Sequence, residues 1–329
     1  MLRIGLVGAG GIGREHLACL LHLEDARVVG VADPVAELAK SAAATAEATA
    51  YADYHELIGK VDAVWICTPT FVHAEQATAF AEAGVHVFCE KPVALDLASA
   101  DRAIAAAKRA GVHLMVGHVI RYYPETVFLK RLVGAGDLGE PVFAFGRRLM
   151  ASAVGEHTGW RRDFSLSGGL AMDSAIHEVD TVRWLAGEVT SVYARVTHGA
   201  PEHPAVDTDV RSLLTLRSGA TAAVDFSLHQ PIREWSWGVV GTRATAFSPR
   251  RGEVRIARLG EREERTVGVD SVGDPVRRLN RSMLAESQAF VEAIRADRTP
   301  PVSGEEGRRN VEVILAMHQS SREGRPVQV

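Results

Sequence analysis

A glycine-rich segment near the start of the chain places the strongest constraint on its fold. Gly8, Gly10 and Gly13 follow a β-forming run, Leu2–Val7, and open a helical pattern that begins near residue 11. In a strand–loop–helix unit, the pattern GxGxxG lets a dinucleotide pyrophosphate approach the backbone beside a helix N-terminus. We therefore predict a Rossmann-type unit whose cofactor contacts are Gly8, Gly10, Gly11, Ile12 and Gly13.

Short β-rich runs alternate with alanine-rich helical segments over the first third of the chain. Strands are expected at 2–7, 27–33, 62–67, 85–90 and 112–116. This alternation predicts βαβ units and a parallel sheet. Several of these runs are apolar throughout rather than alternating, which is typical of strands covered on both faces.

The pattern changes after about residue 117. The elements expected beyond it are a helix at 124–135, a strand at 141–148, a helix at 168–186, strands within 189–268, and helices at 281–296 and 304–323. Sequential strands joined by short turns predict an antiparallel sheet. The predicted fold class is α/β, with a doubly wound parallel Rossmann sheet in residues 1–120 and an α+β domain with a large open, mainly antiparallel sheet in residues 121–329.

The composition narrows the class of protein. With 47% hydrophobic and 24% charged residues, the 329-residue chain is typical of a globular protein. Its net charge of -4, with acids and bases interspersed, argues against a nucleic-acid partner. No run approaches the ~18 apolar residues of a membrane span, and the N-terminus reads as a strand rather than a leader. The three cysteines lack CxxC spacing and are expected to be reduced, so we expect a cytoplasmic protein with no membrane partner.

Asp33 ends the second expected strand, about 20 residues beyond the glycines, where a carboxylate can bind the adenosine ribose 2′-hydroxyl. A carboxylate there repels a 2′-phosphate, and residues 34–37 contain no arginine to neutralise one. NAD is therefore favoured over NADP as the cofactor.

Two later strands end in Thr68-Pro69-Thr70 and Glu90-Lys91-Pro92. Ligands of open α/β sheets bind beyond the carboxyl ends of the strands, so both segments are expected to face the cofactor. A residue that precedes proline is kept out of the helical region. Lys91 can therefore point toward the ligand and polarise a substrate oxygen.

Asp173, His177 and Asp180 are spaced four and three residues apart. A helix places residues at these spacings on one face, so the three side chains are expected to form a titratable stripe beside an apolar one. A stripe of this kind suggests the wall of a site.

Taken together and in order, the motifs resemble the glucose–fructose oxidoreductase/inositol dehydrogenase/MocA family over essentially the whole chain. The matching segments are the Gly8–Gly13 loop, Cys67-Thr68-Pro69 with His73, Glu90-Lys91-Pro92, Gly117–Pro124, Gly168-Gly169, the Asp173…His177…Asp180 helix, and Ser321–Pro326. The resemblance implies a Rossmann domain plus a domain with an open antiparallel sheet, often packed sheet to sheet into homodimers or homotetramers. It also implies NAD(P)-linked oxidation of a secondary alcohol on a sugar or cyclitol.

The resemblance also implies roles for individual residues. Lys91, Asp173 and His177 match the catalytic trio of the family, and Asp180 matches a substrate hydroxyl ligand of its inositol dehydrogenase branch. The further expected cofactor contacts are Thr68, Pro69, His73, Glu90 and Lys91. The expected substrate contacts are Lys91, Arg121, Tyr122, His157, Trp160, His177 and Asp180. No metal is expected, because Thr181 stands where the HExxH motif needs its second histidine.

Oxidation of a secondary hydroxyl requires a base, and His177 suits that role because histidine titrates near neutral pH. Asp173 would orient the imidazole, while Lys91, placed with the help of Glu90, would stabilise the developing alkoxide. Lys91 and His177 could exchange roles.

The most specific prediction is a myo-inositol-type dehydrogenase. The alternatives are a nucleotide-sugar or other carbohydrate dehydrogenase or reductase on the same frame, and a non-catalytic sensor of NAD(H).

Overall fold

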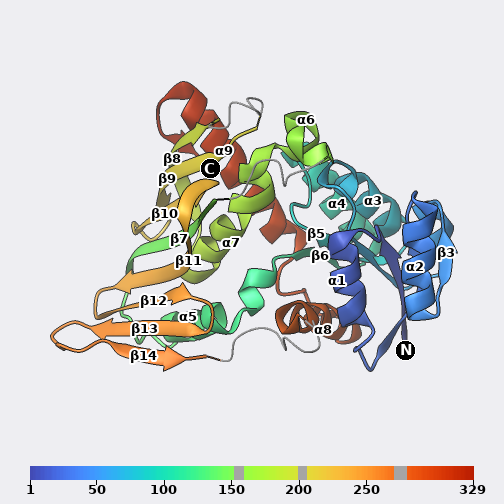
Figure 1. Ribbon diagram of the computed structural model, residues 1–329, viewed down its shortest axis with the longest axis horizontal. Coiled ribbons are helices and arrows are strands. Elements are labelled where there is room, and N and C mark those ends of the chain that lie inside the picture. The colour runs from blue at the N-terminus through green and yellow to red at the C-terminus, as the bar shows by residue number, and fades with distance from the viewer. Residues whose placement is uncertain (152–158, 199–205, 270–279) are drawn as a thin grey trace. The chain divides into compact units, whose positions relative to one another are not determined.

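The computed structural model describes residues 1–151, 159–198, 206–269 and 280–329 (Figure 1). The chain forms two compact units, one from Met1–Val119 with Gly273–Arg309 and one from Ile120–Val272 with Asn310–Val329. The chain thus first passes from one unit to the other between Val119 and Ile120, next to the predicted boundary at residue 120. The return of the chain to the first unit after residue 273 differs from the prediction, which assigned all of 121–329 to a second domain.

The first unit contains a six-stranded sheet in the order β3-β2-β1-β4-β5-β6, with every pair parallel. Its strands are β1 Leu2–Val7, β2 Ala26–Ala32, β3 Thr49–Tyr51, β4 Ala63–Ile66, β5 His86–Glu90 and β6 Leu114–Gly117. The strand order runs outward in both directions from β1 and β4, which confirms the predicted doubly wound sheet. The short edge strand β3 was not anticipated.

Helices cover this sheet, and one of them comes from late in the sequence. The helices of the unit are α1 Gly11–Leu20, α2 Ala36–Ala46, α3 His73–Glu82, α4 Leu97–Ala110 and α8 Arg281–Arg295, with short 3₁₀ turns η1 Tyr54–Leu57 and η2 Thr70–Val72. Helix α8 packs against α1. Its Phe290 ring lies 5.4 Å from the ring of Trp65 and 6.0 Å from that of Phe88, and all three side chains are fully buried. Helix α8 therefore completes the core of the first unit.

The second unit is built on a nine-stranded sheet in the order β14-β13-β12-β11-β7-β10-β9-β8-β15. Its strands are β7 Pro141–Ala151, β8 Val189–Thr197, β9 Asp209–Leu216, β10 Thr221–Ser227, β11 His229–Gly241, β12 Ala244–Arg250, β13 Glu253–Arg258, β14 Arg265–Gly268 and β15 Val327–Gln328. Among the strand pairs that the structure describes in this sheet, only β7 and β10 pair in parallel. The sheet is therefore mainly antiparallel, as predicted.

Besides α8, the helical segments of the described residues after position 118 are η3 Val119–Tyr122, α5 Pro124–Gly134, η5 Gly159–Arg162, α6 Phe164–Ser167, the π-helical turn η6 Ala171–Ala175, α7 Ile176–Ala186 and α9 Gly304–Glu323. Helix α7 packs on β7, β10 and β11, as Figure 1 shows. A Cβ at Gly146 of β7 would lie 3.0 Å from Cβ of Glu178, so glycine lets α7 lie close to the sheet. In the described ranges, no helix has both the length and the apolar character needed to cross a membrane.

Candidate active site

The glycine-rich loop joins β1 to α1 and borders open space at its tip. Gly8 has a φ of +88°, and a Cβ there would lie 2.7 Å from the carbonyl oxygen of Cys67. A Cβ at Gly13 would lie 1.9 Å from the carbonyl oxygen of Gly8. By contrast, a Cβ at Gly10 or Gly11 would meet no atom within 4 Å. Packing therefore requires the outer glycines, while the inner two leave room for a pyrophosphate beside the backbone.

The N-terminus of α1 also suits an anion. Its cap residue is Gly10, no side chain caps it, and its first turn contains no acidic residue. Backbone N–H groups of this turn, which includes Ile12, point toward the loop with the positive end of the helix dipole. The residues of this loop thus fit a dinucleotide cofactor.

Asp33, at the end of β2, is buried and connects two segments around the loop. Its Oδ2 accepts a hydrogen bond from the backbone N–H of Ala9 at 2.8 Å, and its Oδ1 accepts one from Val35 at 2.8 Å. Each carboxylate oxygen can accept a second hydrogen bond. The carboxylate therefore holds the glycine loop and can still receive a ribose hydroxyl.

A buried contact between a histidine and a carboxylate lies beside the backbone of Lys91. His16 of α1 places Nε2 2.8 Å from Oε1 of Glu90, and the backbone N–H of Lys91 donates to Oε2 of Glu90 at 3.0 Å. Burial alone would raise the pKa of Glu90, but the hydrogen bond and charge of His16, together with Lys91, hold it below its usual value. Glu90, predicted as a cofactor contact, thus fixes the backbone at Lys91 through this hydrogen bond. Sequence reasoning assigned no role to His16, although its position one turn after Gly13 places it on the buried side of α1.

His73 lies between the segments that follow β4 and β5. Its Nδ1 is 2.8 Å from the carbonyl oxygen of Pro92, and its Nε2 is 2.8 Å from the carbonyl oxygen of Thr68. The residue is 1% exposed. That His73 contacts the cofactor stays a prediction, and both of its ring nitrogens face backbone carbonyls inside the first unit. Thr68 and Pro69 themselves follow β4, where Thr68 Oγ1 donates to Oε1 of Gln76 at 2.7 Å.

In the second unit, Asp173 and His177 lie on different kinds of helix. Asp173 belongs to the π-helical turn η6, whereas His177 is in the first turn of α7. The segment predicted as a helix over about 168–186 is helical, but residues 171–175 form a π-helical turn, and such turns are frequent at functional sites. Asp173 is buried and its Oδ2 lies 3.3 Å from Nε of Arg161, while His177 is half-buried.

Asp207, which sequence reasoning missed, anchors the start of η6. Its carboxylate accepts hydrogen bonds from the backbone N–H groups of Leu170 and Ala171, at 2.5 and 3.0 Å. Burial raises the pKa of Asp207, against the opposing effects of His318 and of the two N–H groups. No local pattern marks Asp207 as a partner, because 36 residues separate it from Ala171.

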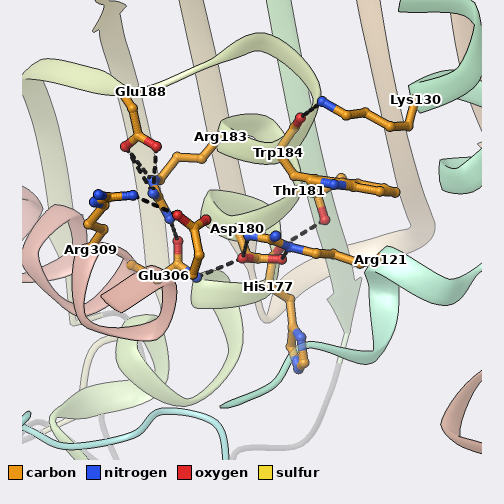
Figure 2. Close-up of polar contacts among 11 residues, drawn as sticks. Arg121, Lys130, His177, Asp180, Thr181, Arg183, Trp184, Glu188, Glu306 and Arg309 are labelled. Carbon is orange, nitrogen blue, oxygen red and sulfur yellow. Dashed lines mark hydrogen bonds and ion pairs between the residues drawn. The ribbon is translucent and has the colours of Figure 1, made fainter. Parts of the chain in front are cut away.

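Asp180 and Arg121 are bound to each other (Figure 2). Arg121 Nε donates to Oδ2 of Asp180 at 2.8 Å and its Nη2 donates to Oδ1 at 2.6 Å. Asn310 Nδ2 also donates to Oδ1 at 2.7 Å, and Arg183 Nη1 donates to Asn310 Oδ1 at 2.5 Å. Asp180 is fully buried and Arg121 is 7% exposed. That both residues contact substrate stays a prediction, and the network shows that their charges also bind each other within the second unit.

Glu178 attaches α7 to the sheet. Its Oε1 accepts hydrogen bonds from Arg148 Nε of β7 at 3.1 Å and from Trp235 Nε1 of β11 at 3.3 Å. Burial raises the pKa of Glu178, with Arg148 and Trp235 opposing the effect. Glu178, the residue after His177, is thus held against β7 and β11.

Of the remaining predicted substrate contacts, two lie in the described residues and one does not. Tyr122 is half-buried at the end of η3. Trp160 is half-buried on η5, with its ring 4.5 Å from the guanidinium carbon of Arg161. His157 lies outside the described residues. Within the described ranges, no group of three or more His, Cys, Asp or Glu side chains is arranged to hold a metal ion.

Comparisons with known proteins agree with this geometry. Residues 2–118 match the family model "Oxidoreductase family, NAD-binding Rossmann fold", and residues 130–329 match "Oxidoreductase family, C-terminal alpha/beta domain". The chain is 31% identical to a myo-inositol 2-dehydrogenase of Thermotoga maritima, covering 100% of this chain and 98% of that protein. It is 29% identical to an NAD(+)-dependent scyllo-inositol 2-dehydrogenase of Bacillus subtilis, covering 100% and 96%.

A solved structure of levoglucosan dehydrogenase in complex with NADH has the same fold, with a TM-score of 0.91 at 24% identity, over 100% of this chain and 99% of the other. The two family models together span nearly the whole sequence. The chain therefore belongs to the glucose–fructose oxidoreductase/inositol dehydrogenase/MocA family of oxidoreductases, and it is an NAD-binding dehydrogenase that acts on CH–OH groups.

Proposed function

We propose that this dehydrogenase oxidises a secondary hydroxyl of a cyclitol or sugar, with a myo-inositol-type polyol as its substrate. The observation that carries the proposal is the placement of a buried carboxylate, Asp173, on a π-helical turn that leads directly into the helix whose first turn holds the half-buried imidazole of His177. The inositol dehydrogenases to which the chain is similar over its full length support the choice of substrate.

The chain's own residues supply the acid–base chemistry. His177 accepts the proton of the substrate hydroxyl at a ring nitrogen, which is worth roughly 10²–10⁴-fold in rate for a well-placed general base. Asp173 orients the imidazole and stabilises its protonated form. Lys91 donates a hydrogen bond to the developing alkoxide, and Glu90 holds its backbone. A bound nicotinamide supplies the hydride acceptor.

Gly8–Gly13 and Asp33 are the proposed contacts to the pyrophosphate and to the adenosine ribose, and Thr68, Pro69 and Lys91 are the proposed contacts near the nicotinamide. Among the predicted substrate contacts, Tyr122, Trp160 and His157 stay in the proposal. Arg121 and Asp180 enter it as positioning residues of α7, because they bind each other.

The charge pairs of the second unit favour a neutral polyol over a nucleotide sugar. A nucleotide sugar needs cations for its diphosphate. Arg147 lies 3.3 Å from Asp225 and 3.4 Å from Glu234, and Arg161 lies 3.3 Å from Asp173. These arginines are thus already paired with carboxylates.

We also propose that the protein is a homodimer or homotetramer that assembles through the nine-stranded sheet. The face opposite α7 carries a row of residues in register across six strands: Tyr193, Leu213, Ala223, Phe145, Gly238 and Phe247. A Cβ at Gly238 would lie 2.6 Å from atoms of both Phe145 and Phe247, so glycine makes room for the two rings. Tyr193 and Leu213 are about half exposed, at 51% and 52%. A row of apolar and aromatic residues on an exposed sheet face is typical of an association surface.

Turnover on a panel of cyclitols, aldoses and sugar acids, followed by the absorbance of NADH with NAD and NADP in parallel, tests the activity. Turnover of one cyclitol with NAD supports the proposal. Turnover confined to nucleotide sugars, or NADH binding without turnover on any polyol, contradicts it. Light scattering of the wild type and of Leu213→Lys tests the assembly, since a charge in the row should shift the mass toward the monomer.

A further inference from the structure

His73 is the first residue of α3, and both of its ring nitrogens face oxygen atoms that can only accept hydrogen bonds. Nδ1 is 2.8 Å from the carbonyl oxygen of Pro92 and Nε2 is 2.8 Å from that of Thr68. A neutral imidazole carries one N–H and can donate to only one of these carbonyls. The other nitrogen would then direct a lone pair at a carbonyl oxygen. Only the protonated ring satisfies both contacts at once.

The two carbonyls belong to segments that leave neighbouring strands at the same edge of the sheet. Thr68 follows β4 and Pro92 follows β5, and the two strands pair in parallel with Ile66 opposite Cys89. Lys91 immediately precedes Pro92, and its backbone N–H is held by Glu90. His73 therefore ties the Thr68 segment to the segment that carries Lys91 by way of its ring.

Few charged groups act on this buried ring. Glu90 favours its protonation, and Lys91, on the same segment, opposes it. Glu75, on α3 itself, is directed to the hydroxyl of Tyr54. Burial raises the pKa of the Cys67 thiol, at the end of β4, well above its usual value, so this neighbour is neutral. From α4, which packs against α3, Arg109 pairs with Glu82 at the far end of the helix.

Burial lowers the pKa of His73, while the two carbonyls and Glu90 oppose this effect. The protonated ring is therefore most populated on the acid side of the ordinary histidine range. As pH rises through that titration, one of the two ties is lost.

We propose that His73 is a positioning residue that acts as a protonation-dependent tie: the protonated ring holds both the Thr68 segment and the Lys91–Pro92 segment, and the neutral ring holds one. NADH binds more tightly when both are held, so binding takes up a proton and its affinity falls as pH rises. The proposal depends on Thr68 and Lys91 lying beside the cofactor, as in the proposed function, but it does not depend on the identity of the substrate.

The test measures NADH affinity of the full-length protein by fluorescence between about pH 5 and 8, the range in which histidine titrates. His73→Asn keeps an amide N–H near the Nδ1 position toward Pro92, and His73→Gln extends one toward Thr68. In the wild type, the affinity for NADH should fall about 3- to 10-fold as pH rises, which corresponds to a modest coupling between protonation of His73 and NADH binding. Both His73 variants should lose this pH dependence of NADH affinity. The control His22→Gln, which changes an exposed histidine of the same unit, should keep it.

A second readout follows the ring itself. In protein labelled with ¹⁵N-histidine, the signal that disappears in His73→Asn should show two protonated nitrogens at the acid end of the range and one at the other. A His73→Asn variant with the wild-type pH dependence would overturn the proposal, and so would a ring that keeps one neutral tautomer throughout. If neither variant folds, the test is calorimetry of NADH binding to the wild type in buffers of different ionisation enthalpy, which measures proton uptake. NADH binding without proton uptake would overturn the proposal. None of these measurements involves a polyol, so failure of the proposed substrate would leave them unchanged.

Discussion

Gly169 lies against the carboxylate of Asp207 so closely that a Cβ at residue 169 would be 2.2 Å from Oδ1 of Asp207. Gly169 also has a φ of +86°, a conformation that disfavours any side chain. The same carboxylate binds the N–H groups of Leu170 and Ala171, which open the segment that carries Asp173. The contact between Gly169 and Asp207 thus sets where the π-helical turn begins, two residues beyond Gly169.

Gly169→Ala should therefore damage both stability and turnover. The left-handed backbone alone costs about 1–2 kcal/mol for a residue with a Cβ, and the displaced carboxylate adds to this. We expect a loss in unfolding free energy above that value and a fall in kcat of more than about tenfold, since a small misplacement of catalytic groups has a large effect. Gly219→Ala is the matched control, because Gly219 has a φ of +89° but open space around its Cβ position. Equal effects of the two substitutions on kcat would show that the Asp207 contact is unimportant.

His177→Ala should lower kcat by roughly 10²–10⁴-fold, the range typical of a lost general base. NADH affinity should hardly change, because the proposed cofactor contacts are the Gly8–Gly13 loop, Asp33, Thr68, Pro69 and Lys91, and His177 is not among them. Steady-state kinetics and NADH titration measure the two effects separately. Wild-type turnover in this variant would rule out His177 as the base, and a larger loss in Lys91→Met with a shifted pH profile would assign the proton to Lys91 instead.

Asp33→Ala should weaken NAD and relax the discrimination against NADP. The carboxylate that repels a 2′-phosphate would be gone, and the N–H of Ala9 would lose its partner. The ratio of kcat/KM for NAD to that for NADP measures the effect. Asp33→Asn removes the charge but keeps one acceptor oxygen for Ala9 or Val35, so it should relax the preference while affecting NAD less. An unchanged ratio in both variants would exclude the ribose contact.

Asp180→Asn should destabilise the second unit strongly. It leaves the Arg121 guanidinium buried without its counter-charge, and breaking a buried ion pair in this way costs about 3–5 kcal/mol. Urea unfolding measures the loss. Arg121→Met combined with Asp180→Leu should recover much of it, because no unpaired charge remains. Asp62→Asn, which weakens the exposed pair with Arg3, should have little effect. If Asp180→Asn instead left stability intact and raised KM for the polyol, Asp180 would be a substrate ligand after all.

Glu90 should contribute to the acid sensitivity of the first unit. Because its pKa is lowered in the folded state, the unfolded chain binds more protons as pH falls toward and below the ordinary value of about 4.3. The stability that the carboxylate provides is therefore present above that value and is lost as pH falls through the folded-state pKa. Glu90→Gln should flatten this part of the stability profile measured by urea unfolding. A steep wild-type profile that the substitution leaves unchanged would contradict this assignment.

Much of the architecture could be predicted from local patterns. Strand and helix periodicity, together with the Gly8–Gly13 loop, correctly indicated the parallel sheet, because these signals depend only on neighbouring residues. The same logic failed for residues 281–309. An apolar helix face shows that Phe290 must be buried, but it does not show that Trp65 and Phe88, more than two hundred residues earlier, are its partners.

The sequence by itself determined the cofactor class and the inventory of titratable groups: the glycine loop, Asp33, Lys91, Asp173 and His177. Only the tertiary structure decided which of the charges are already paired. Asp180 was expected on a stripe with His177, yet it binds Arg121, 59 residues upstream, and His16 binds Glu90, 74 residues downstream. The reason is physical, because the pairing of a buried charge depends on distance in space and on exclusion of water. Both are set by the packing of segments that lie far apart along the chain.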